Sequence, residues 1–136
     1  NPGNDIENLI LHRAKNCYVM LNRYPYNNGH LMIIPYQHCG TLTELEEETW
    51  LEMAKLVRNT ETILKKVYNC DGINIGSNLG CAAGAGIAEH LHIHIVPRWV
   101  GDSNFMSVIG GERVIPESFA SAYNKLAPEF AKLIKN

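Results

Sequence analysis

The sequence lacks the features that mark membrane proteins and nucleic-acid-binding proteins. No apolar run in the 136 residues approaches the roughly 20 residues that a membrane-spanning helix needs. No secretion-signal pattern opens the chain, which begins at Asn1 rather than at a methionine, as a trimmed product would. Lys and Arg number 12 against 14 Asp and Glu, so there is no basic surplus for a phosphate backbone or an anionic membrane. We therefore expect a cytoplasmic protein whose partners include neither a membrane nor nucleic acid.

The four cysteines are scattered and form no Cys-x-x-Cys pair. They stand at Cys17, Cys39, Cys70 and Cys81. Cysteines spaced in this way, in a chain without secretory features, are typically reduced thiols. The lack of a close pair also removes the sulfur ligands that many zinc sites use.

No linker, repeat or low-complexity run divides the chain. With 46% hydrophobic and 19% charged residues, it has the composition of an ordinary globular protein. Its length suits one domain with a core of its own, without disulfide support. We therefore expect residues 1–136 to form a single domain.

The most informative stretch is residues 89–98, which read Glu-His-Leu-His-Ile-His-Ile-Val-Pro-Arg. His90, His92 and His94 alternate there with aliphatic residues. In a strand, successive side chains point to opposite faces, so one face would carry imidazoles and the other aliphatic side chains. A helix would spread the same residues around its circumference. The pattern predicts a strand with a functional histidine face, although clustered titratable residues can also be structural.

The residues before this stretch predict an antiparallel arrangement of strands. Apolar runs at residues 8–12 and 17–21, joined by a short polar segment, predict a β-hairpin. Residues 22–29 are rich in Pro, Asn and Gly and predict a turn. His30 opens the next strand from that turn, a usual place for a functional side chain, and Pro35 ends it.

A long amphipathic helix follows this strand. Thr43 and Glu46 have the spacing of a capping box at its start. Apolar residues then recur every three or four positions as far as Tyr68. We expect this apolar stripe to belong to the core.

The remaining elements complete an α+β fold. Residues 73–77 predict a strand, and residues 78–88 form a loop rich in glycine and alanine that leads directly into the histidines. Residues 118–126 predict a helix, and Pro128 is expected to begin a second short helical piece. The fold class is therefore α+β, with a five-stranded antiparallel sheet, one long helix and a C-terminal helical segment.

Three chemistries suit three histidines on one face. They could bind a metal such as zinc, with His30 or His38 as further ligands. One imidazole could act as a general acid or base. A neutral imidazole could also attack an electrophile while its neighbours bind the developing charge. Backbone N–H groups of the small-residue loop could hold an anion, which favours a phosphate-bearing substrate.

Residues 90–96, His-Leu-His-Ile-His-Ile-Val, resemble the signature of the histidine triad (HIT) family. Residues 22–30 and 33–38 resemble an early block of that family. Residues 84–86 and 97–102 resemble its bacterial branch related to diadenosine-tetraphosphate phosphorylases and hydrolases. The resemblance covers nearly all of the chain. It implies cleavage at the α-phosphate of a (di)nucleoside polyphosphate such as diadenosine tetraphosphate.

The resemblance also implies roles for individual residues. His92 would be the nucleophile that forms a nucleotidyl-histidine intermediate, and His94 would bind the phosphate and help to protonate the leaving group. His90 and His30 would support the site, and Asn22 would bind the ribose hydroxyls. The expected phosphate contacts come from Asn78 and from the backbone of Gly84, Ala85, Gly86 and Ile87.

Two differences from the family pattern bear on the function. Relatives often carry Gln-Ser or Gln-Thr where this chain has Ile87 and Ala88, which disfavours nucleoside phosphoramidate hydrolysis. Some bacterial members bind zinc through a Cys-x-x-Cys that this sequence lacks. We therefore expect no metal ligands and no required cofactor; zinc is disfavoured, and a divalent metal such as magnesium could accompany the nucleotide.

The resemblance further implies a homodimer, because the family is typically homodimeric. Other functions stay open at this point: a phosphoramidate hydrolase, a metal-dependent hydrolase, or a nucleotide-binding adaptor without catalytic activity. The base preference, and the choice of water or inorganic phosphate as acceptor, depend on side-chain positions that a sequence does not specify.

Overall fold

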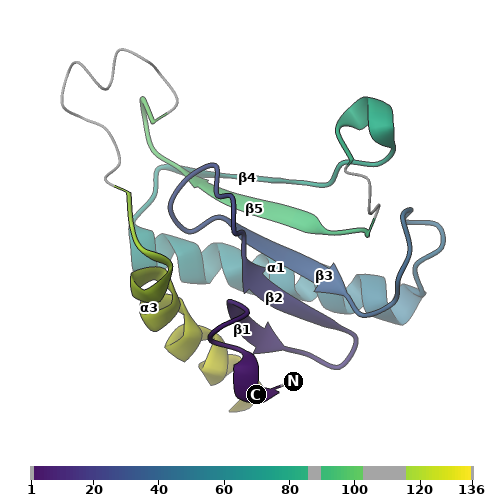
Figure 1. Cartoon of the computed structure of the whole chain (residues 1–136), viewed down its shortest axis with the longest axis horizontal. Helices are drawn as coiled ribbons and strands as arrows, with labels where there is room; N and C mark the ends of the chain where they lie inside the picture. Colours follow the sequence, from purple (N-terminus) through teal and green to yellow (C-terminus); the bar gives the residue numbers. More distant parts are fainter. Residues whose placement is uncertain (1, 86–89, 103–115, 136) are drawn as a thin grey trace.

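The computed structural model describes residues 2–85, 90–102 and 116–135. Its centre is a five-stranded sheet with the strand order β1-β2-β3-β5-β4, in which all neighbouring strands are antiparallel (Figure 1). The strands are β1 (Ile10–Arg13), β2 (Cys17–Leu21), β3 (Leu31–Pro35), β4 (Gly72–Gly76) and β5 (Ile93–Arg98). The predicted fold class is confirmed, with strand bounds that differ from the expected ones by a few residues.

Two helices cover one face of the sheet. The long helix α1 (Glu47–Tyr68) packs on β2, β3 and β5, and α3 (Phe119–Ala131) packs on β1 and on α1. Three short 3-10 turns complete the described elements: η1 (Pro2–Asn4), η2 (Cys81–Ala83) and η3 (Lys132–Lys135). None of the described helices is both long and apolar enough to cross a bilayer.

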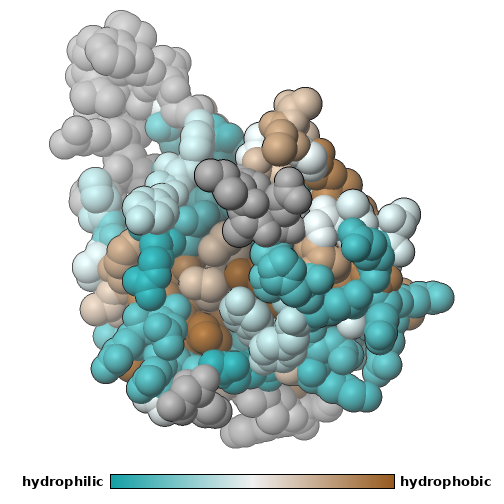
Figure 2. All heavy atoms as spheres, turned by 45° about the vertical axis from the view of Figure 1, so that its right-hand side comes forward, coloured by the Kyte–Doolittle hydropathy of each residue, from teal (hydrophilic) through white to brown (hydrophobic). Residues whose placement is uncertain are grey.

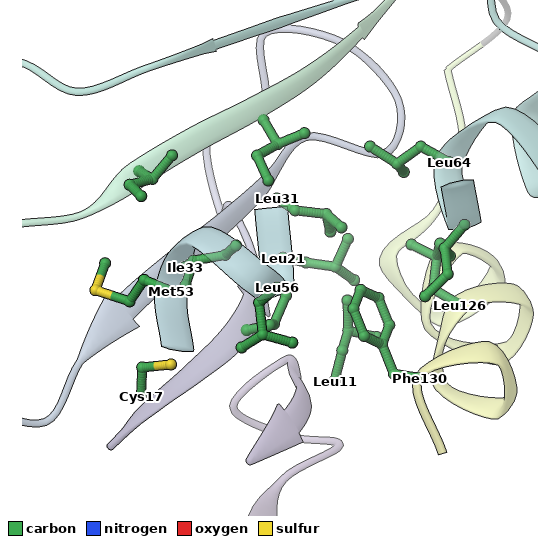
Figure 3. Packing of buried hydrophobic residues seen from close by; sticks show 14 of the residues in the cluster. Leu11, Cys17, Leu21, Leu31, Ile33, Met53, Leu56, Leu64, Leu126 and Phe130 are labelled. Carbon is green, nitrogen blue, oxygen red and sulfur yellow. The ribbon is translucent and has the colours of Figure 1, made fainter. Parts of the chain in front are cut away.

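The core lies between the sheet and the helices. In β2, Cys17, Val19 and Leu21 are buried, whereas the alternating Tyr18 and Met20 are only half-buried on the opposite face. This is the period of two expected for a strand with one covered face. Figure 3 shows side chains from the sheet, α1 and α3 converging in one cluster. Within the described residues, no helix packs on the other face of the sheet, which is the face on which the histidines are expected.

The predicted capping box at Thr43 and Glu46 is wrong. α1 begins at Glu47, and Glu46 at its N-cap makes no side-chain cap hydrogen bond. Gln37 holds the backbone before the helix, because its amide nitrogen donates to the carbonyl of Glu44 (2.7 Å) and its amide oxygen accepts from the N–H of Glu46 (3.1 Å). These two hydrogen bonds keep Glu46 in an extended conformation, and the helix starts at the next residue, Glu47.

The expected break at Pro128 is also wrong, because this residue lies inside α3. A proline in a helix interior removes one hydrogen bond and normally bends or ends the helix. Here Leu126 and Phe130, one helical turn apart, are both fully buried. Burial on both sides of the proline holds the two halves together as one helix, which Ser118 caps by accepting from the N–H of Ser121 (3.1 Å).

The histidine strand is shorter than the sequence predicts. β5 begins at Ile93, which pairs with Ile33 of β3, so His94 is the one triad histidine inside a regular strand. The ladder cannot extend past Pro35, which has no N–H to donate. The carbonyl of Pro35 instead accepts a hydrogen bond from Nε2 of His90 (2.9 Å).

Candidate active site

The sequence alternation does place His92 and His94 on the open face of the sheet. Both side chains are half-buried, whereas Leu91, Ile93 and Ile95 between and beyond them are buried. The two imidazole rings meet edge to face, with centroids 4.4 Å apart. His30, one residue before β3, joins them, with its ring centroid 5.1 Å from that of His94.

The three rings form one directed chain of hydrogen bonds. The backbone N–H of Tyr26 donates to Nδ1 of His30 (3.0 Å). A neutral His30 therefore carries its proton on Nε2, which lies 2.9 Å from Nδ1 of His94. His94 in turn donates from Nε2 to Nε2 of His92 (2.9 Å). His92 donates from Nδ1 to the backbone carbonyl of His90 (2.8 Å).

A backbone group thus fixes each end of the chain. An N–H can only donate and a carbonyl can only accept, so the tautomers of all three neutral rings follow from these two ends. The consequence for chemistry is that Nε2 of His92 keeps its lone pair, with a ring N–H of His94 beside it. This is the arrangement of a nucleophile next to a proton donor.

Burial keeps two rings of this hydrogen-bond chain, those of His30 and His94, neutral near pH 7. Desolvation, with smaller contributions from His94 and His92, lowers the pKa of His30 to about 4. Desolvation also lowers the pKa of His94, and the neighbouring His92 adds to that shift. Both rings are therefore uncharged at neutral pH, as the tautomer chain requires.

The ring of His90 lies apart from this chain of hydrogen-bonded rings. Its ring is held by the Pro35 carbonyl and lies beside the ring of His38, with centroids 4.9 Å apart. The backbone N–H of Leu91 donates to the carbonyl of Cys39 (2.8 Å). This hydrogen bond anchors the backbone next to His90 to the segment after β3. The predicted grouping of three histidines is therefore two adjoining rings, those of His92 and His94, with the ring of His90 apart from them.

A groove of about 640 Å³ opens beside His90 and His92. Tyr18, Met32 and Ile34 of the open sheet face line it, together with residues of the 38–44 and 78–85 segments. Figure 2, which turns the right-hand side of Figure 1 forward, shows apolar patches between hydrophilic side chains on this face. A second, shallower hollow of about 260 Å³ lies on the side of His30 and His94, lined also by Tyr26 and Arg98.

The predicted phosphate-binding segment lies at the edge of the larger groove. Asn78 and Ala85 line it, and the Asn78 amide sits 3.6 Å from where a side chain would begin at Gly84. The N–H groups of Gly84 and Ala85 donate to carbonyls of their own turn, at 3.0 and 3.2 Å. A phosphate contact through these two groups stays a prediction and requires that turn to open. The predicted contacts at Gly86 and Ile87 lie outside the described residues.

Asn22 is brought to the histidine chain, although it does not line the larger groove. Its side-chain nitrogen lies 3.3 Å from Nε2 of His30. Its side-chain oxygen accepts from the backbone N–H of Tyr24 (2.8 Å), which fixes the orientation of the amide. Nε2 of His30 already carries a proton, so the Asn22 NH2 group cannot donate to it. This NH2 group can therefore donate a hydrogen bond to a ligand. The predicted ribose contact is compatible with this geometry and is not tested by it.

Sequence reasoning missed the residues that hold the histidine chain in place. The backbone N–H of Tyr26 fixes one end, and Asn27 and Asp102 tie its loop to the segment after β5. A backbone donor leaves no signature in a sequence. Asp102 lies within the residues that resemble the bacterial branch of the family, but its partner Asn27 stands 75 residues earlier.

Comparison with known proteins decides the family. Residues 4–100 match the family model described as the HIT domain. The chain belongs to the HIT family. A solved HIT protein, a Zn-bound histidine triad family protein from Mycobacterium smegmatis, is 28% identical and superposes with a TM-score of 0.74, covering 93% of this chain and 86% of its own.

Several curated relatives carry names that specify an activity. The HIT chain is 47% identical over 131 residues to an AP-4-A phosphorylase of Mycobacterium tuberculosis, covering 94% of this chain and 66% of that protein. It is 29% identical over 93 residues to a bis(5'-nucleosyl)-tetraphosphatase (asymmetrical) of Schizosaccharomyces pombe, covering 68% of this chain and 50% of that protein. The HIT chain thus spans less than two thirds of the length of either relative.

Among the described residues, the HIT chain offers no set of ligands for zinc, the metal in the M. smegmatis relative. Within residues 2–85, 90–102 and 116–135, no three His, Cys, Asp or Glu side chains are grouped to hold a metal ion. His38 and His90 lie side by side, but the sequence has no Cys-x-x-Cys to complete the site. The Nε2 atom of His90 is also engaged by the Pro35 carbonyl.

Proposed function

We propose that this HIT domain cleaves a dinucleoside polyphosphate such as diadenosine tetraphosphate at the α-phosphate, through a nucleotidyl-histidine intermediate. One observation carries the proposal. The hydrogen-bond chain from Tyr26 to His90 leaves the lone pair of His92 on Nε2, beside the Nε2–H of His94. A preset lone pair next to a preset proton donor is what attack on phosphorus and departure of a phosphate oxygen require.

The reaction has two balanced steps. In the first, the Nε2 lone pair of His92 forms a bond to the α-phosphorus as the P–O bond to the leaving phosphate breaks, and the leaving oxygen takes that electron pair. The N–H of His94, now facing this oxygen, stabilises its charge or protonates it. In the second, water or inorganic phosphate attacks the phosphorus, and the P–N electron pair returns to His92. A proton that the acceptor loses returns to the nitrogen of His94 or passes to solvent.

The histidine hydrogen bonds also stabilise the positive charge that develops on the nucleophile. His92 becomes cationic when it bonds to phosphorus, and its Nδ1–H already donates to the His90 carbonyl (2.8 Å). That carbonyl stabilises the developing charge without any rearrangement. His30, neutral and fully engaged, orients His94 rather than reacting.

The two hollows suit a substrate with two arms. His92 lines the groove of about 640 Å³ and His94 lines the hollow of about 260 Å³, so the 2.9 Å contact between these rings marks their junction. A dinucleoside polyphosphate that reacts at this junction can place an arm in each. The names of the mycobacterial and fission-yeast relatives support the same substrate class.

The polar side chains around the junction have defined tasks in this proposal. Asn22, held by the Tyr24 N–H, binds a ribose hydroxyl. Asn78, on the groove wall, binds a phosphate oxygen, together with the backbone of residues 84–87. The reaction requires no cofactor of the protein, although magnesium can accompany the nucleotide.

The direct test is product analysis with diadenosine tetraphosphate, with and without inorganic phosphate. We expect ADP and ATP when phosphate is the acceptor, and AMP and ATP when water is. His92→Ala should lower the rate by several orders of magnitude, as loss of a nucleophile does. His12→Asn is the matched control, since His12 lies in β1 beside Phe130, away from the hydrogen-bonded histidines.

Two outcomes would contradict this function, and a third would contradict its mechanism. A folded sample that binds the nucleotide and turns over neither this substrate nor adenosine phosphoramidate would favour a binding or adaptor role. Activity that is lost with a chelator and restored with stoichiometric zinc would favour a metal-dependent hydrolase. An undiminished rate in His92→Ala would remove that residue from the role of nucleophile.

We also propose that the domain works as a homodimer in the cytoplasm. β4 is an edge strand, and Ile75 in it is 50% exposed although its cross-strand partner Ile95 is fully buried. A second copy that covers this edge would bury Ile75. The four cysteines, all in the described part of the chain, form no disulfide, as expected in a reducing compartment. Sedimentation of Ile75→Lys against the unchanged protein tests the dimer.

A further inference from the structure

We infer that Asp102 is a positioning residue for the catalytic histidines, acting through Asn27 and the loop between β2 and β3. Asp102 lies four residues after the end of β5 and touches none of the histidines. The connection therefore passes through the loop that carries Tyr26 and His30.

Asp102 is the centre of a dense, buried hydrogen-bond cluster. Its side chain is 2% exposed, and Arg98 donates to both of its oxygens, at 2.9 Å each. The backbone N–H of Trp99 donates to it as well, at 2.9 Å. The Arg98 guanidinium hydrogen-bonded to it holds the pKa of Asp102 well below its usual range. The carboxylate is therefore a fixed anionic acceptor at neutral pH.

A further donor to the Asp102 carboxylate comes from the loop before β3. The side-chain nitrogen of Asn27 donates to Asp102 at 2.6 Å and to the carbonyl of Pro97 at 3.2 Å. Both contacts tie the β2–β3 loop to the C-terminal end of β5, over which this loop lies in Figure 1. Arg98 adds a third tie, because its guanidinium lies 5.1 Å from the centre of the Tyr26 ring.

The anchored loop determines which tautomer His30 adopts, and through it the tautomers of the other two rings. Asn27 follows Tyr26, whose N–H donates to Nδ1 of His30, and the Asn27 carbonyl accepts the backbone N–H of His30 at 3.2 Å. A loop that moved by an ångström would release the Nδ1 atom of His30. His30 could then place its proton on either nitrogen, and its donation to His94 would no longer be enforced.

The inference rests on the proposed function only for its effect on rate; the effect on His30 can be measured without substrate. In Asp102→Asn the carboxylate becomes an amide of the same shape, so one of the donors around it meets an N–H. We expect the ring 15N resonances of His30 to change from one fixed tautomer to a mixture of two. With diadenosine tetraphosphate, kcat should fall about tenfold to a hundredfold with little change in KM, since misplacement by about 1 Å has costs of this size.

Two further variants separate positioning from general damage. Asn27→Ala removes the link and keeps the Asp102–Arg98 pair, so it should alter the His30 resonances as Asp102→Asn does. The two changes together should cost little more than either alone, because they break one connection. Asp71→Asn is the control: Asp71 also accepts a backbone N–H in the neighbouring turn, that of Val100 (2.8 Å), but has no contact with the β2–β3 loop.

The outcomes distinguish this inference from the proposed function. Unchanged His30 resonances in both folded variants would overturn the positioning role. Equal changes in Asp71→Asn would overturn it too, because they would point to a general loosening of the turn. Altered resonances in a protein without turnover of the dinucleotide would support the positioning role and count against the proposed reaction.

Discussion

At the scale of single residues, the proposed reaction requires three neutral imidazoles. His30 is 7% exposed, and desolvation is the main reason that its pKa is about 4 in the folded chain. The ordinary histidine value of 6.5 applies to the unfolded chain. The buried ring therefore couples the charge state of the site to the stability of the fold.

This coupling predicts how stability varies with pH. Between pH 6.5 and about 4 the unfolded chain binds a proton that folded His30 does not, so acid favours unfolding in that window. The free energy of unfolding should fall by up to about 3 kcal/mol from this group as the pH is lowered through the window. Denaturant titrations at several pH values measure it. Since the pKa of His12 is lowered as well, the reference is His30→Asn, which should show a shallower pH dependence.

At the scale of elements, glycine at position 29 allows the β2–β3 loop to close on the rest of the fold. Gly29 has φ +75°, and a side chain there would begin 2.7 Å from the Tyr68 ring and 3.1 Å from Pro97. Gly29→Ala should destabilise the fold by about 2 kcal/mol or more, from backbone strain and this clash together. Gly72→Ala is the matched control, since that site has an ordinary φ and no atom within 4 Å. Equal losses in the two variants would contradict this account.

Similar substitutions near the starts of the two helices should have different effects on the stability of the fold. Ser118 accepts the N–H of Ser121 at the start of α3, so Ser118→Ala should cost about 1 kcal/mol. Thr43 has the sequence position of a cap but lies outside α1, and its hydroxyl lies 3.3 Å from that of Thr41. Thr43→Ala should therefore change stability by less than about 0.5 kcal/mol. Thermal unfolding of both variants decides between the sequence pattern and the observed cap.

These elements also show where sequence reasoning succeeds. The period of two around His92 and His94 identifies an extended segment and its polar face, because neighbouring side chains in a strand face opposite ways. The start of α1 is not readable in this way, since Gln37, ten residues upstream, holds the backbone before it. Local patterns report local geometry, and long-range contacts override them.

The same limit applies to the candidate site. The histidines, Asn22 and Asn78 are polar side chains in recognisable patterns, and the structure brings them to one region. The tautomer chain depends on a backbone N–H at Tyr26, a group that every residue except proline has, and on a backbone carbonyl at His90, a group that every residue has. Which of them is used follows from the three-dimensional fold alone.

At the scale of the whole molecule, α3 closes the core at the β1 end of the sheet. Phe130 is fully buried among residues of the sheet and α1 (Figure 3). Phe130→Ala should cost about 3–5 kcal/mol, because it leaves a cavity in a packed core. Phe119→Ala in the same helix should cost less than about 1 kcal/mol, since Phe119 is 39% exposed. Calorimetry of the two variants tests whether α3 contributes through its buried face.

The Tyr26 amide has one more consequence, for hydrogen exchange. Its acceptor is a ring nitrogen of His30, which becomes a donor as soon as that ring is protonated. The amide should therefore be protected from exchange with deuterium at neutral pH, although Tyr26 as a residue is 60% exposed. Its protection factor should drop as the pH approaches about 4, the pKa of His30, while that of Tyr24, which donates to an uncharged amide, should not. A single backbone proton in an exposed loop thus reports the charge of the buried site.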